Sequence, residues 1–306
     1  MRVKRPGVQV RARKGYWALN QEQTARALAP PKAAVPKPVE NAIASATARP
    51  SKATIVRTWI GSSRGENGKT RVTFTWEPLP KSPGDRPTGR EEPARVSLMA
   101  LGADGSLVFR GRVPDAALAS AGAPPAAGSD ASPPRQGQAA PARGPSRVVF
   151  DAPPGKVQLR ISVEGASSQV LDSEVREIAV PDLTAAQPTL GTPAVLRGRT
   201  LPEFNRLKAD ADAVPIAVRE FNRTERLLIR IPAYGPGGTS PVLKVHVLNR
   251  AGSTMNELQA APSPKAGEQQ IELPLASFPP GEYVIEIKAG DQDGDAKELL
   301  GFRVTG

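Results

Sequence analysis

Two stretches of the sequence, DAPPGKVQLRISV at residues 151–163 and SFPPGEYVIEIKA at residues 277–289, share one pattern. In each stretch a Pro-Pro-Gly triplet precedes alternating apolar residues, and a further strand-like run follows. Proline fixes φ and cannot donate a hydrogen bond to a neighbouring strand, whereas glycine permits a tight approach of the backbone. The pattern therefore predicts the same structural corner twice, each at the start of the penultimate strand of a β-domain. The corner residues are Pro153, Pro154, Gly155, Pro279, Pro280 and Gly281.

The two corners differ in one residue that matters for their stability. Tyr283 follows the second triplet by two positions, where immunoglobulin-like sandwiches often place a tyrosine whose hydroxyl bonds to the corner backbone. Val157 stands at the matching position after the first triplet. We therefore expect this hydrogen bond in the second corner only. Proline and glycine bring no reactive group, which favours a structural role for both triplets.

Strand-like runs fill the sequence on both sides of the corners. Residues 53–181 hold about seven such runs, with turn residues roughly every 8–12 positions, which is the spacing of a β-sandwich. Residues 193–306 hold a second set, and neither set keeps a helical period over several turns. The sequence predicts an all-β chain with two tandem sandwiches of immunoglobulin-like or fibronectin type III-like fold.

Stretches rich in Pro and Ala separate these blocks. The stretch at 114–146 consists mainly of Pro, Ala, Gly and Ser, which offer little apolar surface to offset the entropy of ordering. We interpret it as a disordered loop inserted in the first sandwich. The predicted parts are a strand remnant of an absent upstream domain (1–19), a Pro/Ala-rich linker (20–52), the first sandwich (53–182), a second linker (183–192) and the second sandwich (193–306).

Composition narrows the classes of function. The 306 residues include no cysteine, which excludes disulfides, thiolate metal sites and cysteine nucleophiles. The net charge is +11, and the first 20 residues carry six basic residues and no acid. Aromatic residues, Tyr16 and Trp17, stand only at the end of this arm, which argues against nucleic acid as a partner. No apolar run of about 18 residues predicts a transmembrane segment, and the N-terminal residues do not have the pattern of a signal peptide.

The candidate reactive residues all fit structural roles. His246, the only histidine, alternates with apolar residues on a predicted strand and should face solvent. Residues 62–70 resemble a phosphate loop in composition, but a strand and not a helix follows them. A weak calcium candidate lacks the bidentate glutamate of a calcium loop; its residues are Asp291, Asp293 and Asp295. We predict no catalytic residue, no cofactor and no further metal ligand, and we expect the protein not to be an enzyme.

Several longer stretches resemble one group of bacterial proteins. RVKRPGVQVRARKGYWA at residues 2–18 is similar to the segment that closes the von Willebrand factor A-related domain in chiefly acidobacterial proteins. TWIGSSRGENGKTRVTFTWEP at 58–78 and AVREFNRTERLLIRI at 217–231 resemble the C-terminal region of the same proteins. The Asp-x-Ser-x-Ser metal site of the A domain has no counterpart in this sequence, so its ligands transfer to no residue here. The resemblance implies a noncatalytic protein exported to the periplasm or the cell exterior.

Two functions fit these observations. The first is a pair of structural or protein-binding modules. The alternative is an accessory module of an exported enzyme system that binds carbohydrate or peptide through Trp59, Trp76 and Tyr234. The alternative requires these aromatic side chains to line one exposed face, and burial of Trp59 and Trp76 would remove it.

Overall fold

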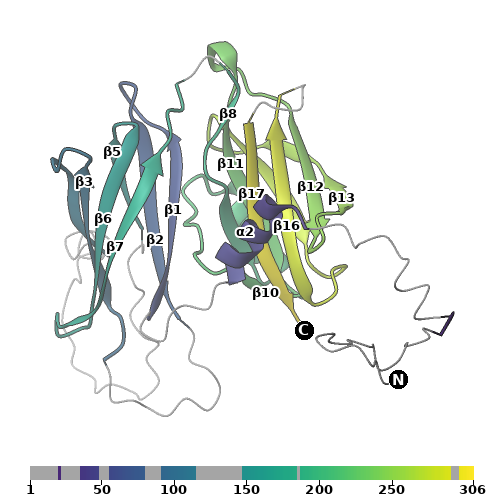
Figure 1. The fold of residues 1–306 in the computed structure, drawn as a ribbon, viewed down its shortest axis with the longest axis horizontal. Helices are drawn as coiled ribbons and strands as arrows, with labels where there is room; N and C mark the ends of the chain where they lie inside the picture. Colours follow the sequence, from purple (N-terminus) through teal and green to yellow (C-terminus); the bar gives the residue numbers. More distant parts are fainter. Residues whose placement is uncertain are drawn as a thin grey trace, which may run out of the picture. The chain divides into compact units, whose positions relative to one another are not determined.

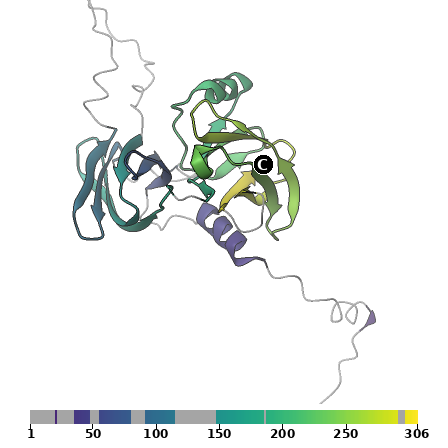
Figure 2. The ribbon, with the colours of Figure 1, turned by 90° about the horizontal axis from the view of Figure 1, so that it is seen from above.

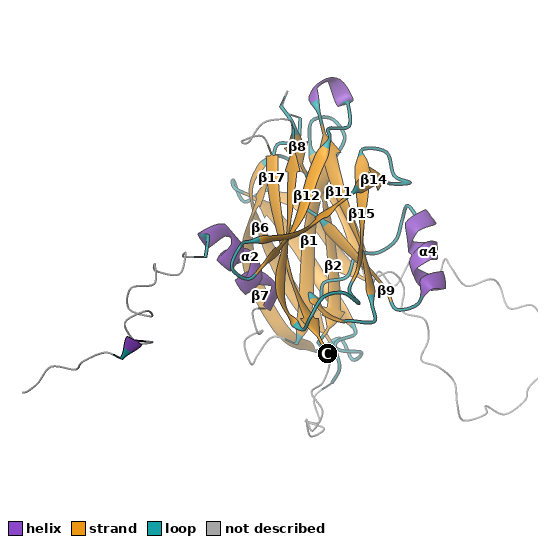
Figure 3. Ribbon diagram, turned by 90° about the vertical axis from the view of Figure 1, so that its right-hand side faces the viewer, coloured by secondary structure: helices purple, strands orange, loops and turns teal. Residues whose placement is uncertain are grey.

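The computed structural model describes residues 20–21, 35–47, 55–79, 91–114, 147–184, 187–290 and 296–306. Val35–Gly306 form one compact unit. Strands dominate this unit, together with the helices α2 (Lys37–Thr47) and α4 (Leu201–Ala209) and a short 3-10 turn, η1 (Pro236–Gly238) (Figure 3). The strands form two sandwiches, each with its own buried core. The predicted all-β class is therefore confirmed.

The first sandwich has seven strands among the described residues. They are β1 (Val56–Arg64), β2 (Thr70–Pro78), β3 (Arg95–Gly102), β4 (Leu107–Val113), β5 (Arg147–Ala152), β6 (Gly155–Glu164) and β7 (Val170–Val180). One sheet has the order β1–β2–β5 and the other the order β4–β3–β6–β7, and all neighbouring strands are antiparallel (Figure 1). This division of seven strands is that of a fibronectin type III-like sandwich.

The core of the first sandwich follows from the two-residue period of its strands. Phe74 and Trp76 on β2 belong to the same buried cluster as Leu98 on β3 and Leu159 on β6. The indole N–H of Trp76 donates to the carbonyl of Val113 at 3.0 Å, so the one polar group of this side chain is satisfied. Side chains that alternate with these core residues on β3 and β6 face away from the core.

The second sandwich has more strands in its described part. They are β8 (Thr189–Leu190), β9 (Ala194–Gly198), β10 (Glu220–Asn222), β11 (Arg226–Tyr234), β12 (Leu243–Asn249), β13 (Thr254–Leu258), β14 (Ala260–Pro262), β15 (Glu268–Pro274), β16 (Gly281–Ala289) and β17 (Ala296–Thr305). One sheet has the order β14–β15–β11, with both β8 and β9 paired to β11. The other has the order β10–β17–β16–β12–β13, and β10 runs parallel to β17. This arrangement is immunoglobulin-like.

Helix α4 covers part of one outer face of the second sandwich. Thr200 caps its N-terminus by accepting a hydrogen bond from the backbone of Glu203, whose carboxylate accepts one from the backbone of Arg199. Phe204 is buried against Leu196 of β9, in a cluster separate from the main core. The sequence predicts no helix of several turns in this block, and the structure has a capped helix of nine residues here.

Helix α2 covers the other outer face of the second sandwich (Figures 1 and 2). Its buried residues recur at helical spacing; they are Val39, Ala42, Ile43 and Ala46. The first three form a cluster with Leu248 of β12 and Val284 of β16. On β17 the helix passes so close to Gly301 that a Cβ at this position would collide with the carbonyl of Ala42. Glycine at 301 therefore permits the approach of helix and sheet.

The structure differs from the predicted domain plan in two places. Residues 20–52 are predicted as a linker, but residues 37–47 of this stretch form α2. Residues 183–192 are predicted as a second linker, but β8 lies within them and Leu183 is buried. The predicted strand remnant at 1–19 and residues 115–146, nearly all of the predicted disordered loop, lie outside the described residues.

Candidate functional site

The corner glycines allow the two sandwiches to be compared residue by residue. Gly155 begins β6 and pairs with Val180 on the last strand of the first sandwich. Gly281 begins β16 and pairs with Val304 on the last strand of the second sandwich. Counting along the strands from these two pairs gives matched positions on the central and final strands of both sandwiches.

The outer face of the sheet β4–β3–β6–β7 carries two rows of side chains that run across the strands. In the first row the paired residues, from β4 to β7, are Arg110, Met99, Arg160 and Val175. In the second row they are Arg112, Ser97, Ser162 and Ser173. Their neighbours along β3 and β6 are buried in the core, so these rows point outward. Nothing among the described residues packs over them as α2 does on the second sandwich.

The same rows line a hollow of about 600 Å³ on the sheet surface. Its lining combines guanidinium groups with the thioether of Met99 and the side chain of Val175, which is 63% exposed. Glu174 is the one carboxylate in this lining, and it forms an ion pair with Arg176 at 2.7 Å. The hollow is therefore an open surface with a mixed basic and apolar character.

The arginines of the hollow differ in how far they are neutralised. Among the described residues, no carboxylate lies within ion-pair distance of Arg110 or Arg160; Arg160 donates only to the side-chain amide of Gln158, at 3.4 Å. Arg112 lies 3.9 Å from the carboxylate of Glu164. Positive charge is therefore concentrated in the row that contains Met99.

Glu164 anchors one end of this surface. Its carboxylate is buried and accepts a hydrogen bond from the hydroxyl of Ser97 at 2.6 Å. Arg95 and Arg112 both approach it at 3.9 Å, while its second oxygen has no hydrogen-bond partner in the described structure. The carboxylate is therefore held in place by groups on β3 and β4, and it fixes Ser97 at the edge of the hollow.

The matching row of the second sandwich has the opposite charge. Its paired residues, from β13 to β17, are Glu257, His246, Glu286 and Leu299. His246 lies on the outer face, with its Nδ1 atom 3.9 Å from the carboxylate of Glu286. Burial would raise the pKa of Glu286, but contacts with the ammonium groups of Lys297 and Lys288 outweigh it and lower this pKa. Glu286 is therefore neutralised by lysines of the chain itself.

A second pair of matched positions lies on the final strands. Glu174 of β7 corresponds to Glu298 of β17, and Arg176 corresponds to Leu300, which is buried. Glu174 therefore forms an ion pair with Arg176, two residues along its strand. At the matched position beside Glu298 the residue is Leu300, which carries no charge. Burial raises the pKa of Glu298 to about 7.

The two predicted corners are formed differently. The Tyr283 hydroxyl donates to the carbonyl of Pro279 at 2.7 Å, and its ring packs against Phe278 and Phe302. At the first corner Gly155 has a φ of 131°, a conformation that favours glycine, and Val157 occupies the tyrosine position in the core. Only the second corner is fastened by a side-chain hydrogen bond.

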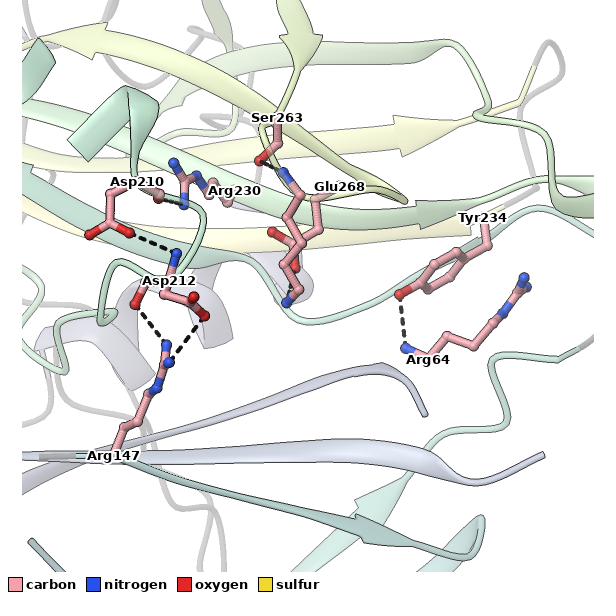
Figure 4. A network of polar contacts seen from close by, with 9 residues as sticks. Arg64, Arg147, Asp210, Asp212, Arg230, Tyr234, Ser263 and Glu268 are labelled. Carbon is pink, nitrogen blue, oxygen red and sulfur yellow. Dashed lines mark hydrogen bonds and ion pairs between the residues drawn. The ribbon is translucent and has the colours of Figure 1, made fainter. Parts of the chain in front are cut away.

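Polar contacts join the two sandwiches within the compact unit (Figure 4). The backbone N–H of Arg64 donates to the Tyr234 hydroxyl at 2.8 Å, and the Arg64 guanidinium lies 4.2 Å from the centre of the Tyr234 ring. The same guanidinium donates to the carbonyl of Leu183. The Ser62 and Thr192 hydroxyls are 2.9 Å apart. Residues 62–70, which resemble a phosphate loop in composition, thus form part of this junction.

A second group of contacts in Figure 4 surrounds the C-terminal end of α4. Arg147 donates to both the carbonyl and the carboxylate of Asp212. Arg230 projects from β11 and donates to the carbonyls of Asp210 and Leu207 at 2.6 and 2.7 Å. A cation at this end of a helix complements the helix dipole. These contacts are structural, and they hold the end of α4 against β5 and β11.

The aromatic side chains proposed for carbohydrate binding do not line one exposed face. Trp76 is only 2% exposed and lies in the core of the first sandwich. Trp59 is half-buried beside Gly61, and Tyr234 is engaged by Arg64 at the junction. The exposed aromatic platform that the carbohydrate alternative requires is therefore not formed by these three rings, which pack against the protein itself.

No metal site is found within the described residues, where no group of three or more His, Cys, Asp or Glu side chains is placed to hold an ion. The calcium candidate Asp291, Asp293 and Asp295 lies outside the described residues. No helix in the described ranges has the length and apolar character needed to span a membrane.

The three arginines of the hollow were not singled out from the sequence. Each alternates with apolar residues, in FRGRV at residues 109–113 and LRISV at 159–163, which is the ordinary pattern of a half-exposed strand. Alternation indicates that Arg110, Arg112 and Arg160 face solvent. It cannot show that β4 and β6 flank β3, and that pairing is what brings the arginines together.

Comparisons with known proteins add little to this picture. No family model matches the chain, and no curated protein matches it. Among solved structures, it is similar to fibronectin(III)-like modules of Clostridium thermocellum CbhA, with 14% identity, 81% of this chain and 92% of that chain covered, and a TM-score of 0.23. Domains 4 and 5 of the S-layer protein SbsC match with 11% identity, 84% and 100% coverage and a TM-score of 0.21. The D00-D0 domain of Intimin matches with 10% identity, 54% and 76% coverage and a TM-score of 0.21. The strand order of the chain itself remains the basis for its fold class.

Proposed function

We propose that this chain is a noncatalytic module that binds a protein partner through the outer face of β4–β3–β6–β7. The observation that supports this proposal is the contrast between two matched sheet faces. In the second sandwich α2 covers the face and buries its apolar residues, whereas in the first sandwich the face is open and hollowed. A partner would supply for the first sandwich the cover that α2 supplies for the second.

The composition of the open face favours protein over carbohydrate. Arginine and methionine are enriched in protein interfaces, and methionine adapts its shape to different partners. Arg110, Arg160 and Met99 provide this combination in one row. Sugar-binding surfaces commonly use aromatic rings, and no aromatic residue is among those that line the hollow.

The proposal includes a family and a compartment. We place the chain in the C-terminal region of exported proteins related to the von Willebrand factor A domain, and the resemblance of residues 2–18, 58–78 and 217–231 supports this placement. The test is the DNA upstream of the codon for Met1. An open reading frame with a signal peptide and an Asp-x-Ser-x-Ser domain is the expected result, and its absence would contradict the placement.

Site-specific cross-linking tests the binding face. A photoreactive residue is placed at Val175 on the open face or, as a control, at Val242 in the second sandwich, which is 69% exposed. After irradiation in the cells that make the protein, we expect discrete adducts from position 175 and not from 242. Adducts from neither position, or the same adducts from both, would overturn the proposed binding face.

A further inference from the structure

We propose that the partner of the open face is an acidic protein segment whose carboxylates pair with Arg110 and Arg160 on either side of an apolar side chain. This inference rests on the proposed function and specifies the chemistry of the partner. It is carried by the unneutralised charge of one row, by the spacing of its arginines and by the contrast with the matched row in the second sandwich.

The charge of the row is not compensated by the residues that the structure describes. Arg110 and Arg160 have no carboxylate within ion-pair distance among the described residues. Further along the same face, Lys156 of β6 and Glu177 of β7 form an ion pair at 3.0 Å and neutralise each other. On this sheet face, positive charge without a carboxylate partner among the described residues therefore lies in the hollow, where a partner's carboxylates would find guanidinium groups with free N–H donors.

The spacing of the row specifies the arrangement of the partner's side chains. Arg110 and Arg160 lie on β4 and β6, with Met99 of β3 between them. Strands in a sheet lie about 4.8 Å apart, so the two arginine backbones are roughly 10 Å apart. Two carboxylates flanking an apolar residue match this order, because the apolar residue would contact Met99 while the carboxylates meet Arg110 and Arg160.

The matched row shows that the basic character does not come from the fold. Glu257 and Glu286 occupy the positions of Arg110 and Arg160 in the second sandwich. The same backbone arrangement therefore carries either sign of charge. The acidic row is also a poor partner for the basic row of a second copy, since Lys288 and Lys297 already engage Glu286 and α2 covers part of the adjoining surface.

An acidic protein segment fits better than a nucleic acid. A nucleic acid backbone is bound by basic residues spread along a track, and single strands are also held by aromatic rings on which the bases stack. The hollow has three arginines, no aromatic residue in its lining and an apolar floor between two of the arginines. Charge complementarity combined with local apolar contact is typical of protein interfaces.

Fluorescence anisotropy with synthetic peptides tests this inference on the full chain. The probe is a labelled peptide in which glutamates flank leucines, and the matched probe replaces each glutamate with glutamine. We expect saturable binding of the glutamate peptide that weakens as salt increases, and binding of the glutamine peptide that is at least about tenfold weaker. The double variant Arg110→Glu/Arg160→Glu should also weaken binding of the glutamate peptide by about tenfold or more.

A matched variant keeps the test independent of net charge. Arg206→Glu/Arg226→Glu changes the charge by the same amount at exposed positions of the second sandwich, and it should keep the affinity within about twofold. Unfolding midpoints of both double variants verify that they are folded. No saturable binding, equal binding of both peptides, or equal loss in both variants would overturn the inference.

Other anions and a second copy are distinguished in the same experiment. Duplex DNA or anionic vesicles that bind through Arg110 and Arg160 as well as the peptide does would overturn the choice of a protein segment. Self-association that these two substitutions abolish would point to a second copy and would also overturn it. If position 175 cross-links to a protein that is not acidic, the inference fails while the proposed binding face stands.

Discussion

The two sandwiches use the same corner and the same central strands but finish their outer faces in different ways. On the second sandwich, Val284 and Leu248 lie beneath α2, and Gly301 leaves room for the helix. On the first, the matched positions of β6 and β7 carry Gln158 and Glu177, both exposed. The difference teaches that the same sheet arrangement can be covered by a helix or left open. A few outward-facing residues, apolar or small in one sandwich and polar in the other, decide which of the two occurs.

The largest expected effect comes from exchanging one matched pair of residues. Val284→Gln places on the covered face the residue that stands at 158 on the open face. Val284 is fully buried, so the amide would lose its hydrogen bonds to water and α2 would lose an apolar contact. We expect a loss of about 2–4 kcal/mol in the free energy of unfolding, measured by urea denaturation.

The reverse exchange is the control. Gln158→Val changes an exposed residue and should alter the free energy of unfolding by less than about 0.5 kcal/mol. Equal effects of the two substitutions would show that the two faces are not covered differently in solution.

A smaller effect is expected from narrowing the space beneath the helix. Gly301→Ala adds a methyl group that collides with the backbone of Ala42. Because backbone cannot move as freely as a side chain, we expect a loss of about 1–3 kcal/mol and faster amide hydrogen exchange within α2. Glu177→Ala, at the matched position on the open face, removes one exposed ion pair and should cost less than about 1 kcal/mol. Unchanged exchange in α2 would contradict the close packing at Gly301.

The matched carboxylates Glu298 and Glu174 should differ in how they affect the free energy of unfolding. The pKa of Glu298 rises from 4.5 to about 7 on folding, so the folded chain holds this proton more tightly than the unfolded chain. Its contribution to stability is complete below pH 4.5 and is lost as the pH rises through 7. Glu298→Gln should therefore raise the free energy of unfolding at pH 8 by about 1–2 kcal/mol and change it little at pH 4.

Glu174→Gln is the control for Glu298→Gln, because Glu174 has a cationic partner and Glu298 lies beside Leu300 instead. Glu174 pairs with Arg176 at the surface, so its removal should lower the free energy of unfolding by no more than about 1 kcal/mol at pH 8. Denaturation at several pH values measures both variants. A stabilising Glu174→Gln, or a Glu298→Gln whose effect does not vary with pH, would contradict the comparison.

The smallest effect is expected at the fastened corner. Tyr283→Phe removes the hydrogen bond to Pro279 but keeps the ring that contacts Phe278 and Phe302. We expect a loss of about 1 kcal/mol in the free energy of unfolding, since the carbonyl of Pro279 loses its tyrosine donor. A wild-type stability in this variant would show that the corner is held by packing alone.

Much of the fold could be predicted from the sequence because strands and turns leave local signals. Alternation in KVQLRISV and EYVIEIKA predicts the two penultimate strands, and the position of Tyr283 two residues after Gly281 matches the corner tyrosine of immunoglobulin-like sandwiches. The sequence pattern does not predict helix α2, although the buried residues of this helix recur at helical spacing. Two of them are alanines, which contribute little to a hydrophobic pattern, and the prolines before the helix suggested a linker.

The open face could not be predicted, because its residues come from strands that are distant in sequence. Arg110 and Arg160 are separated by the whole of residues 115–146, and only the strand order β4–β3–β6 makes them neighbours in one row. The pairing of Glu174 with Arg176 is local and can be read from the sequence. The environment of Glu298 cannot be read from the sequence, since the burial of this carboxylate depends on the assembled core.

Helix α2 also sets an order of events when the chain is made on a ribosome. It precedes the first sandwich in sequence but packs on β16 and β17, which are nearly the last parts to be synthesised. Ala42 and Gly301 are roughly 260 residues apart, so at ~5–20 residues per second the helix waits tens of seconds for its sheet. During that interval the first sandwich can fold completely while the apolar side of α2 stays exposed. Any shortened product that stops before β17 keeps that side uncovered, which would mark unfinished chains for chaperones and proteases.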